Sequence, residues 1–478
     1  MRRSPSRALT VGRIAALVML LSITVPAQNA EQPDWKNLEN ETMQHFQALV
    51  RMDTSDPPGK ERPAADYLRQ VLEKEGIPVQ VFALETDRTN VIARLNGSGR
   101  KRPLLIMGHT DVVNVDPKKW NFPPFGATRD GGYVYGRGAI DDKDNVVASL
   151  MTMLELKRLK TPLDRDVIFL AEAGEEGSTR VGIQYMVNQH FPEIDAEYCL
   201  AEGGNVMRSG GQVRFASVQT LEKIPRAIEL TAHGVSGHGS IPLKTNPIVH
   251  LSAAVAAVAN WRTPIRINDT VGAYFSRLAE ISFPQEAQRY RDILSQDPKK
   301  RDAADEYFLE NEPRHASMVR TSISPNMFTA GYRLNVIPSE AKATLDVRTL
   351  TDENPARFIE EVRKVVNDPA VEVNWAQRDV RPGAAVGRLD SEIFKTLEAS
   401  VTKNYRTVTL PTMSTGATDM SYLRAKGIEC YGIGPALDLE DGPKGFGAHS
   451  DQERILESEL HRFVRFTWDA VTDLARAK

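Results

Sequence analysis

Five side chains of metal-ligating type follow apolar or glycine-punctuated segments that are spread over most of the chain. They are two histidines and three acids, namely His109, Asp141, Glu176, Glu202 and His449. In four of the segments a strand-like run delivers an acid or an imidazole to what should be one edge of a sheet. Two neutral imidazoles and three carboxylates carry a charge of about −3, which two divalent cations and one hydroxide would bring near neutrality. The chain is therefore expected to form an α/β fold in which distant segments meet at a metal site.

Length and charge limit the architecture and the partners. A chain of 478 residues exceeds the size at which one core keeps growing, so two domains are expected. The apolar fraction of 41% is ample for packed cores. A net charge of −3 and a pI of about 6.4 leave no basic surface for nucleic acid or an anionic membrane. We therefore expect a small-molecule substrate and no nucleic-acid partner.

The N-terminal segment resembles a secretory signal. Four arginines within the first 13 residues precede an apolar stretch over residues 14–25, and small residues follow up to Ala27. This pattern predicts a signal peptide over residues 1–27 and a mature chain that is secreted or periplasmic, with no stable membrane association after cleavage. The alternative is an uncleaved anchor, although the stretch is short for a membrane span. Cys199 and Cys430 lie in apolar contexts and are expected to be buried free thiols.

Helical and strand periodicities alternate through residues 28–222 and resume over residues 381–478. Helices are predicted at 38–50, 64–75 and 144–159, and strands at 79–83, 90–95, 103–107 and 166–171. Alternation of this kind indicates a mostly parallel, helix-covered sheet with its ligand site at the carboxyl ends of the strands. These two segments are predicted to form one catalytic domain.

A second domain is predicted over residues 223–380, inserted into the first. Strands at 226–232, 327–335, 340–347 and 370–375, with helices at 247–261 and 354–366, form a βαββαβ series typical of a ferredoxin-like unit. The polar stretch 285–313 is interpreted as a helical insertion rather than a linker.

Eight phrases of the sequence resemble, in order, the motifs of the dinuclear zinc metallopeptidase and amidohydrolase family. That family includes glutamate carboxypeptidase, aminoacylase, succinyl-diaminopimelate desuccinylase, carnosinase and the Gly-X carboxypeptidases. The phrases are GHTDVV, YGRGAIDDKD, EAGEEGS, AEGG, SGHGSIP, NVIPSEAKATLDVR, STGATDMSYL and AHSDQER. The resemblance runs from about Trp35 to the C-terminus and implies a zinc-exopeptidase-like fold with an inserted lid and dimerisation domain.

The resemblance implies two Zn²⁺ ions per chain, with Co²⁺ or Mn²⁺ as substitutes. Asp141 would bridge both metals, His109 and Glu202 would complete one site, and Glu176 and His449 the other. Each site then keeps open positions, as a catalytic zinc site requires.

Three further residues match positions with catalytic roles in the family. Glu175 would carry the proton from the attacking water to the leaving amine. Asp111 would accept the other imidazole N–H of His109 and fix its tautomer, or it could be an ordinary turn residue. His238 would stabilise the oxyanion in the active site of a neighbouring subunit, which implies a homodimer, or it could be structural.

Substrate contacts are implied for Arg348, Asn335 and Gly416. A guanidinium suits a two-point grip on a terminal carboxylate, which makes the free carboxylate of an amino acid the expected group. The simpler interpretations are a strand arginine, a turn asparagine and a turn glycine with local hydrogen bonds.

The resemblance therefore implies a carboxypeptidase-like zinc exopeptidase, which the signal-like N-terminus predicts to be secreted. Its substrates would be short peptides or N-acyl amino acids with a free C-terminal carboxylate, hydrolysed by a metal-bridged hydroxide. A dipeptidase, aminopeptidase or aminoacylase using the same site is the alternative within enzymes, and an inactive binding scaffold is the alternative outside them. Two departures from the family pattern are Asp144, where glycine is common, and Glu202 in place of aspartate.

Overall fold

The structure is a computed structural model that describes residues 1, 32–377, 380–383 and 385–477. By its internal contacts the chain divides into Met1–Gln32 and Pro33–Lys478, and the helices and strands below belong to the second unit. Apart from residue 1, the predicted signal segment lies outside the described residues. Among the helices of the described part, none has the length and apolarity needed to cross a membrane.

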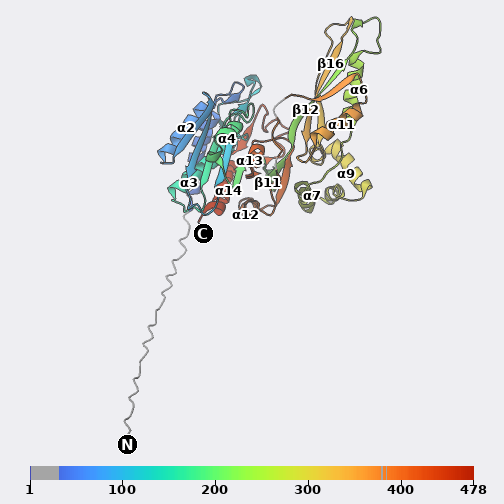
Figure 1. The fold of residues 1–478 in the computed structure, drawn as a ribbon. Coiled ribbons are helices and arrows are strands. Elements are labelled where there is room, and N and C mark those ends of the chain that lie inside the picture. Colours follow the sequence, from blue (N-terminus) through green and yellow to red (C-terminus); the bar gives the residue numbers. More distant parts are fainter. Residues whose placement is uncertain (2–31, 378–379, 384, 478) are drawn as a thin grey trace. The chain divides into compact units, whose positions relative to one another are not determined.

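A ten-stranded sheet is the largest of the sheets that the described residues form (Figure 1). Its strands, in spatial order, are β2 (Val79–Glu85), β3 (Arg88–Leu95), β8 (Val167–Glu172), β4 (Leu104–His109), β9 (Tyr198–Ala201), β19 (Glu429–Gly432), β11 (Gln212–Glu222), β10 (Val206–Ser209) and β20 (Ala436–Asp438), and β18 (Thr409–Ser414) pairs with β11. The central strands β8, β4, β9 and β19 are all parallel. The predicted mainly parallel sheet is therefore confirmed, with antiparallel strands toward its edges.

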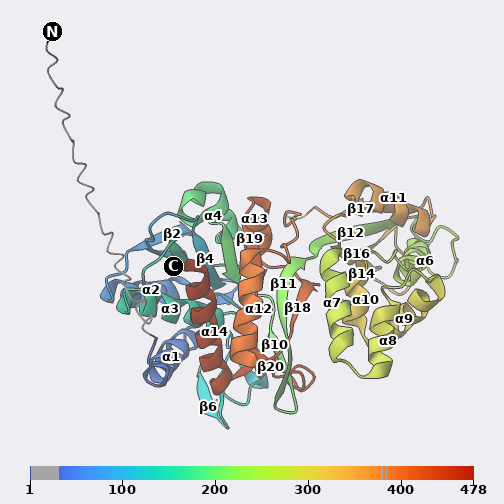
Figure 2. The same cartoon turned by 90° about the horizontal axis from the view of Figure 1, so that it is seen from below.

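Helices cover both faces of this sheet (Figure 2). One face packs against α1 (Trp35–Val50), α2 (Arg62–Lys74), α3 (Lys143–Arg158), α12 (Glu392–Tyr405) and α14 (Glu457–Ala475), and the other against α4 (Ile183–Gln189), α5 (Phe191–Ile194) and α13 (Met420–Ala425). In β4, Leu104 and Ile106 belong to the first core and Leu105 and Met107 to the second. Because side chains alternate across a strand, a run that is apolar at every position must be buried on both faces.

Short elements surround the carboxyl edge of the sheet. β1 (Ser55–Asp56) pairs with β5 (Val112–Val113), and β7 (Tyr133–Tyr135) lies between β6 (Thr128–Asp130) and β21 (Arg454–Leu456). A single 3-10 turn covers Pro117–Lys119. Cys199 and Cys430 are free and buried on adjacent strands β9 and β19.

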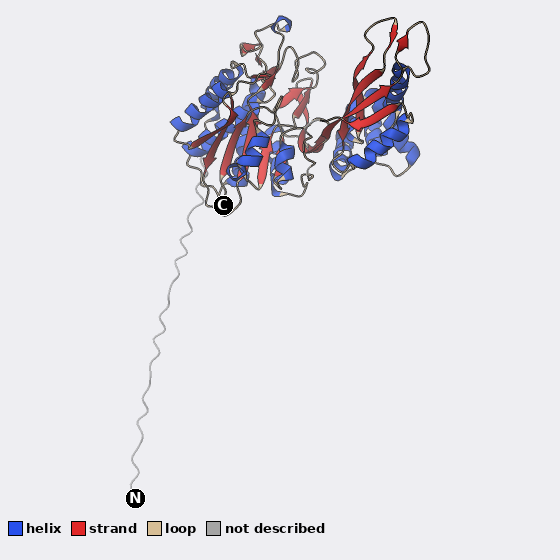
Figure 3. Cartoon of the chain, turned by 45° about the horizontal axis from the view of Figure 1, so that its top comes forward, coloured by secondary structure: helices blue, strands red, loops and turns tan. Residues whose placement is uncertain are grey.

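A second, four-stranded antiparallel sheet has its own apolar core. Its order is β14 (Ser322–Ala330), β16 (Glu340–Thr349), β12 (Ile224–His233) and β17 (Val371–Trp375), and it packs against α6 (Pro247–Asn260) and α11 (Pro355–Val366) (Figure 3). A separate ribbon pairs β13 (Gly237–His238) with β15 (Val336–Ile337). These elements follow the predicted βαββαβ order, while the limits of the inserted domain stay a prediction.

The strand expected over residues 327–335 is wrong in its position. β14 covers Ser322–Ala330, and the chain then turns at Gly331, whose φ is +66°. Glycine adopts this left-handed conformation without the steric cost that a Cβ would bring. Asn335 therefore lies in the loop before β15, although apolar residues such as Leu334 continue the strand-like composition.

The helical insertion is confirmed, and it packs partly against the large sheet. The predicted range, residues 285–313, contains α8 (Pro284–Asp292) and α9 (Pro298–Asn311), and α7 (Asp269–Ile281) and α10 (Pro313–Met318) extend the insertion on either side. Phe275 and Phe308 from these helices share one apolar core with Leu410 and Met413 of β18. The insertion therefore packs against strands that belong to the predicted catalytic domain.

Candidate metal centre

Three adjacent parallel strands deliver three of the candidate ligands to one edge of the large sheet. His109 is the last residue of β4, Glu176 lies in the loop after β8, and Glu202 directly follows β9. Because β8, β4 and β9 run in the same direction, their carboxyl ends meet at one edge. The structure thus brings together residues that are up to 93 positions apart, as His109 and Glu202 are.

Asp141 lies between the two histidines. His109 Nε2 is 3.1 Å from Asp141 Oδ1, and His449 Nε2 is 3.1 Å from Asp141 Oδ2. Each oxygen of one carboxylate therefore faces a different imidazole. That is the arrangement a carboxylate needs in order to bridge two cations.

The two remaining acids lie near different histidines. His449 Nε2 is 2.7 Å from Glu176 Oε1, and His109 Nε2 is 4.0 Å from Glu202 Oε2. Ligand atoms of His109, Asp141 and Glu176 lie within 4.8 Å of one another. Glu176 thus contacts His449 and also lies within reach of His109, so both the ligation and the partition between two metals that the family resemblance implies stay predictions.

Burial and mutual contact perturb the ionisation of these groups. Burial and the nearby Glu175 carboxylate raise the pKa of Glu202 well above its usual range. Burial also favours the neutral form of Asp141, but hydrogen bonds from the two imidazoles outweigh it and lower the Asp141 pKa. Hydrogen bonds to Asp141 and Glu176 raise the pKa of His449 to about 10. Crowded carboxylates with imidazoles turned toward them are a donor set that fits divalent zinc, cobalt or manganese, since cations would relieve the repulsion.

Asp111 fixes the loop that carries Glu175 and Glu176. Its fully buried carboxylate accepts backbone N–H bonds from Gly174 at 2.8 Å, Glu175 at 3.2 Å and Glu176 at 3.0 Å. The Nδ1 atom of His109 is 3.0 Å from the carbonyl oxygen of Asp111 and 3.6 Å from its carboxylate. Asp111 can therefore orient His109 through its backbone as well as its side chain.

Glu175 lies between the ligand cluster and an arginine that sequence reasoning missed. A Glu175 carboxylate oxygen lies within 4.8 Å of ligand atoms of His109 and Glu202. Arg381 donates to Glu175 Oε1 and to Asp419 Oδ1, both at 2.9 Å. Burial and the Asp419 carboxylate raise the pKa of Glu175 to about 8, and the Arg381 guanidinium opposes that rise. Glu175 is thus held by an ion pair beside the ligands rather than directed to solvent.

A second buried ion pair joins the loops that carry Asp141 and His449. Arg137 donates to Glu453 at 2.6 Å and to the carbonyl of Ser450, the residue after His449. The other oxygen of Glu453 accepts the N–H of Ile140, the residue before Asp141. Both charged residues lie within the motif phrases YGRGAIDDKD and AHSDQER, but spacing alone does not reveal that they pair.

Replacing Arg137 with methionine is expected to lower the free energy of unfolding by about 3–5 kcal/mol, because Glu453 would be left as an uncompensated buried charge. The side chains of Arg137 and Glu453 are only 3% and 0% exposed. The matched control is Arg129→Met, whose ion pair with Glu457 is 53% exposed on the arginine side and should contribute about 1 kcal/mol or less. Denaturant unfolding measures both, and equal losses would contradict a special role for the buried pair.

The residues predicted in the inserted domain form a different group. His238 is exposed and its Nδ1 accepts from the backbone N–H of Ser240 at 3.2 Å, with the Ser240 hydroxyl 2.7 Å away. The carbonyl of Asn335 accepts the N–H of Gly239 at 2.9 Å, so Asn335 lies beside the His238 loop. Among the described residues, His238 belongs to no group of His, Cys, Asp and Glu side chains that could hold a metal ion.

The two other predicted substrate contacts have local partners. Arg348, on β16, makes two hydrogen bonds to Asp346 at 2.8 and 3.0 Å. The N–H of Gly416, in the loop after β18, donates to Ser414 Oγ at 3.1 Å. Arg348 would therefore have to leave or share Asp346 in order to hold a substrate carboxylate.

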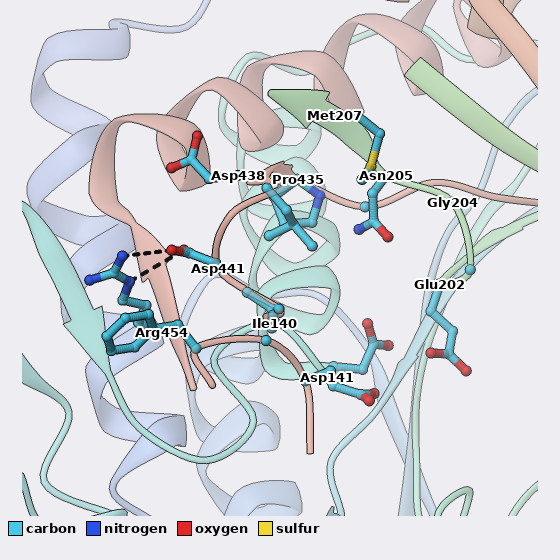
Figure 4. Close-up of a pocket in the computed structure, with 18 of the residues that line it drawn as sticks. Ile140, Asp141, Glu202, Gly204, Asn205, Met207, Pro435, Asp438, Asp441 and Arg454 are labelled. Carbon is cyan, nitrogen blue, oxygen red and sulfur yellow. Dashed lines mark hydrogen bonds and ion pairs between the residues drawn. The ribbon is translucent and has the colours of Figure 1, made fainter. Parts of the chain in front are cut away.

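A cavity of about 310 Å³ opens beside Asp141 and Glu202 (Figure 4). The loops after β9, before β20 and between β20 and β21 form most of its walls, and Ile140, Asp142 and Asn145 at the start of α3 complete them. Arg454 donates to Asp441 at one side of this cavity, so these two charges neutralise each other. Substrate-sized space is thus present next to the cluster.

Comparison with known proteins places this site in a family context. The model described as peptidase family M20/M25/M40 matches residues 105–473. A probable carboxypeptidase S-like 2 from Dictyostelium discoideum is 28% identical over 332 residues, which are 66% of this chain and 62% of the relative. The human N-fatty-acyl-amino acid synthase/hydrolase PM20D1 is 29% identical over 57% of this chain and 54% of its own. The chain thus spans less than two thirds of the length of these curated relatives.

Solved structures support the fold. The M20 family metallo-carboxypeptidase Sso-CP2 from Sulfolobus solfataricus has a TM-score of 0.67 at 20% identity, covering 90% of this chain and 98% of that one. Human carnosine dipeptidase 1 has a TM-score of 0.63 at 14% identity, covering 92% and 97%. With the family model matching most of its length, the chain belongs to peptidase family M20/M25/M40.

Proposed function

We propose that this chain is a two-zinc, carboxypeptidase-like hydrolase of short peptides or N-acyl amino acids that have a free C-terminal carboxylate. Membership in a peptidase family gives amide hydrolysis as the reaction class. The observation that carries the dinuclear proposal is Asp141, whose two oxygens each lie 3.1 Å from a different imidazole. The names of the carboxypeptidase S-like and N-fatty-acyl-amino acid hydrolase relatives support the substrate class.

His109 and Glu202 would hold one cation, Glu176 and His449 the other, and Asp141 both. When bound, such cations polarise a substrate carbonyl and lower the pKa of a water molecule. Asp111 keeps the Glu175 and Glu176 loop in place through its three accepted N–H bonds.

Glu175 is proposed to take a proton from the attacking water and deliver it to the leaving amine. Its carboxylate lies within 4.8 Å of ligand-type atoms of His109 and Glu202 and is held in place by Arg381 at 2.9 Å, which supports this role. His238 is proposed to stabilise the developing oxyanion in a partner subunit, since it is exposed on the inserted domain. Arg348, Asn335 and Gly416 are proposed to bind the substrate carboxylate and carbonyl.

The proposal also includes the location and the oligomeric state of the protein. The signal-like N-terminus supports a secreted or periplasmic location for the mature chain. Exposed apolar residues on the edge strand β14, including Met327 and Phe328, support a homodimer formed through the inserted domain.

Protein purified without chelator is expected to contain about two divalent ions per chain. The reason is that the five proposed ligands include one carboxylate, Asp141, that both ions would share. Elemental analysis of the wild type measures this ratio. Asp141→Ala serves as the comparison, since loss of the shared carboxylate should weaken both sites at once. A reproducible ratio of one in the wild type would contradict the dinuclear proposal.

Substrate class is tested with dipeptides blocked at one end. Zinc-loaded enzyme is expected to hydrolyse N-blocked dipeptides with a free carboxylate about 10- to 100-fold better than the matching C-terminal amides, because a charge-assisted hydrogen bond is lost in the amide. The reverse preference would support an aminopeptidase. Hydrolysis that requires both free ends would support a dipeptidase.

A further inference from the structure

Arg381 connects the proposed proton carrier to a second buried acid. Its guanidinium donates to Glu175 Oε1 through Nη2 and to Asp419 Oδ1 through Nη1, at 2.9 Å in each case. The Arg381 side chain is only 16% exposed, and those of Glu175 and Asp419 are 10% and 2% exposed. A planar guanidinium between two such carboxylates offsets their repulsion in one fixed geometry. Arg381 therefore sets where the two acids lie relative to each other.

The hydrogen bonds of Glu175 leave one of its side-chain oxygens free. Arg381 holds Oε1, whereas Oε2 accepts no hydrogen bond from the residues that the structure describes. The backbone at Glu175 is fixed separately, because the carboxylate of Asp111 accepts its N–H at 3.2 Å. A proton carrier must stay within hydrogen-bond reach of the proton that it takes, with one oxygen open to it. The contact with Arg381 meets the first condition and leaves the second intact.

Asp419 is itself tied to the end of β11. The preceding residue, Thr418, donates to Glu222 Oε2 through its hydroxyl at 2.6 Å and through its N–H at 3.2 Å. Glu222 is the last residue of β11, and the same oxygen accepts from Gln219 at 2.8 Å. Among the described residues, Asp419 Oδ2 is buried without a hydrogen-bond partner, so the side chain of Asp419 is held through Oδ1 and Arg381.

Residues that follow Arg381 lie against the junction between the two sheets. Gly387 donates its N–H to the carbonyl oxygen of Thr220 on β11 at 2.8 Å. A Cβ on Gly383 would lie 3.1 Å from Cδ1 of Ile224, the first residue of β12. Arg381 thus extends to Glu175 from the place where the chain passes from the large sheet to the smaller one.

We propose that Arg381 is a positioning residue for amide hydrolysis, which holds Glu175 beside the proposed metal ligands by joining it to Asp419 and the end of β11. The proposal rests on the proposed function, because Arg381 acts through the proton transfer assigned there to Glu175. Arg381 is not among the described residues that line the cavity beside Asp141 and Glu202. It is therefore assigned no contact with the substrate.

Arg381→Met in the zinc-loaded full chain is expected to lower kcat about 10- to 100-fold, the usual range when a group that orients active-site residues is lost. KM for an N-blocked dipeptide should stay within about twofold, and elemental analysis should still give about two metal ions per chain. The matched control is Arg388→Met on the same segment, which should leave kcat within about twofold. The Arg388 side chain is 63% exposed and pairs with the exposed Asp390.

A double-mutant cycle distinguishes positioning of Glu175 from any other effect of the substitution. If Arg381 acts through Glu175, Glu175→Ala combined with Arg381→Met should have a kcat within about twofold of Glu175→Ala alone, because residues that act as a unit are not additive. A further loss of about tenfold or more in the double variant overturns the proposal. Loss of metal from Arg381→Met overturns it as well, since Arg381 would then support the ligands.

The position of the Glu175 carboxylate is a readout that requires no hydrolysis. In a crystal structure of zinc-loaded Arg381→Met it is expected to move by about 1 Å or more from its wild-type place, a displacement sufficient for losses of this size. An unmoved carboxylate overturns the proposal. If thermal unfolding shows that Arg381→Met does not fold, Arg381→Lys decides in its place. An ammonium lacks the planar fork that bridges two carboxylates, so this variant should show a smaller change of the same kind.

The outcomes separate this inference from the proposed function. If Glu175→Ala is inactive and Arg381→Met keeps the wild-type kcat, the positioning role fails and the hydrolase proposal stands. If the wild type cleaves neither peptides nor N-acyl amino acids, the proposed function fails. The displacement of Glu175 in crystals of Arg381→Met, compared with Arg388→Met, then still decides whether Arg381 positions that side chain.

Discussion

Glu175→Ala is expected to lower kcat by a factor of about 10²–10⁴ and to leave both metal ions bound. The proposed ligands remain in this variant, while the group that carries the proton is removed. The structure gives Glu175 a specific environment for that role, since it lies beside ligand atoms of His109 and Glu202 and is held by Arg381 at 2.9 Å. Steady-state kinetics and elemental analysis on the same preparation measure the two effects.

The adjacent acid provides the control. Glu176→Ala should lose affinity for one metal ion, because Glu176 lies 2.7 Å from His449 and is one of the proposed ligands. The two variants change neighbouring residues but should lose different functions. Glu175→Ala should lose proton transfer, and Glu176→Ala should lose metal binding. Near-normal turnover of Glu175→Ala would remove Glu175 from the mechanism, and loss of metal from it would make it a ligand.

Strand periodicity predicted that the candidate ligands lie at one edge of the sheet, because the end of a buried strand is set by the local sequence. Each apolar run fixes a buried strand, and His109 and Glu202 lie at or just after the ends of β4 and β9. Parallel strands then place these side chains at one edge whatever lies between them in sequence. The same reasoning predicted the alternation of helices with the central strands, since it depends only on which residues must be buried.

The partners of Arg381 and Arg137 could not be predicted in this way. Arg381 reaches Glu175 across 206 positions, and Arg137 reaches Glu453 across 316. Such pairs depend on tertiary packing and leave no periodic signal in the sequence. The same is true of the packing of helices α7–α10 against β11 and β18 of the large sheet.

Mixing His238→Ala chains with Glu175→Ala chains is expected to restore activity that neither variant has alone, if His238 acts in a partner's active site. Loss of one oxyanion donor should lower kcat by about 10²–10³, so each parent is nearly inactive. A hybrid dimer has one site with an intact Glu175 and an intact His238. Recovery of roughly a quarter of wild-type activity is expected when random exchange makes about half of the dimers hybrid.

The inserted domain offers the surface that such a dimer requires. β14 is an edge strand of the four-stranded sheet, and its Met327 and Phe328 are 64% and 47% exposed. An unpaired edge with exposed apolar side chains is suited to pairing with a second copy. Phe328→Asp in both chains should therefore prevent dimer formation and abolish the recovery, whereas Leu309→Asp on α9 should not. If exchange is demonstrated by mass spectrometry and no activity returns, His238 acts within its own chain or serves only the structure of its loop.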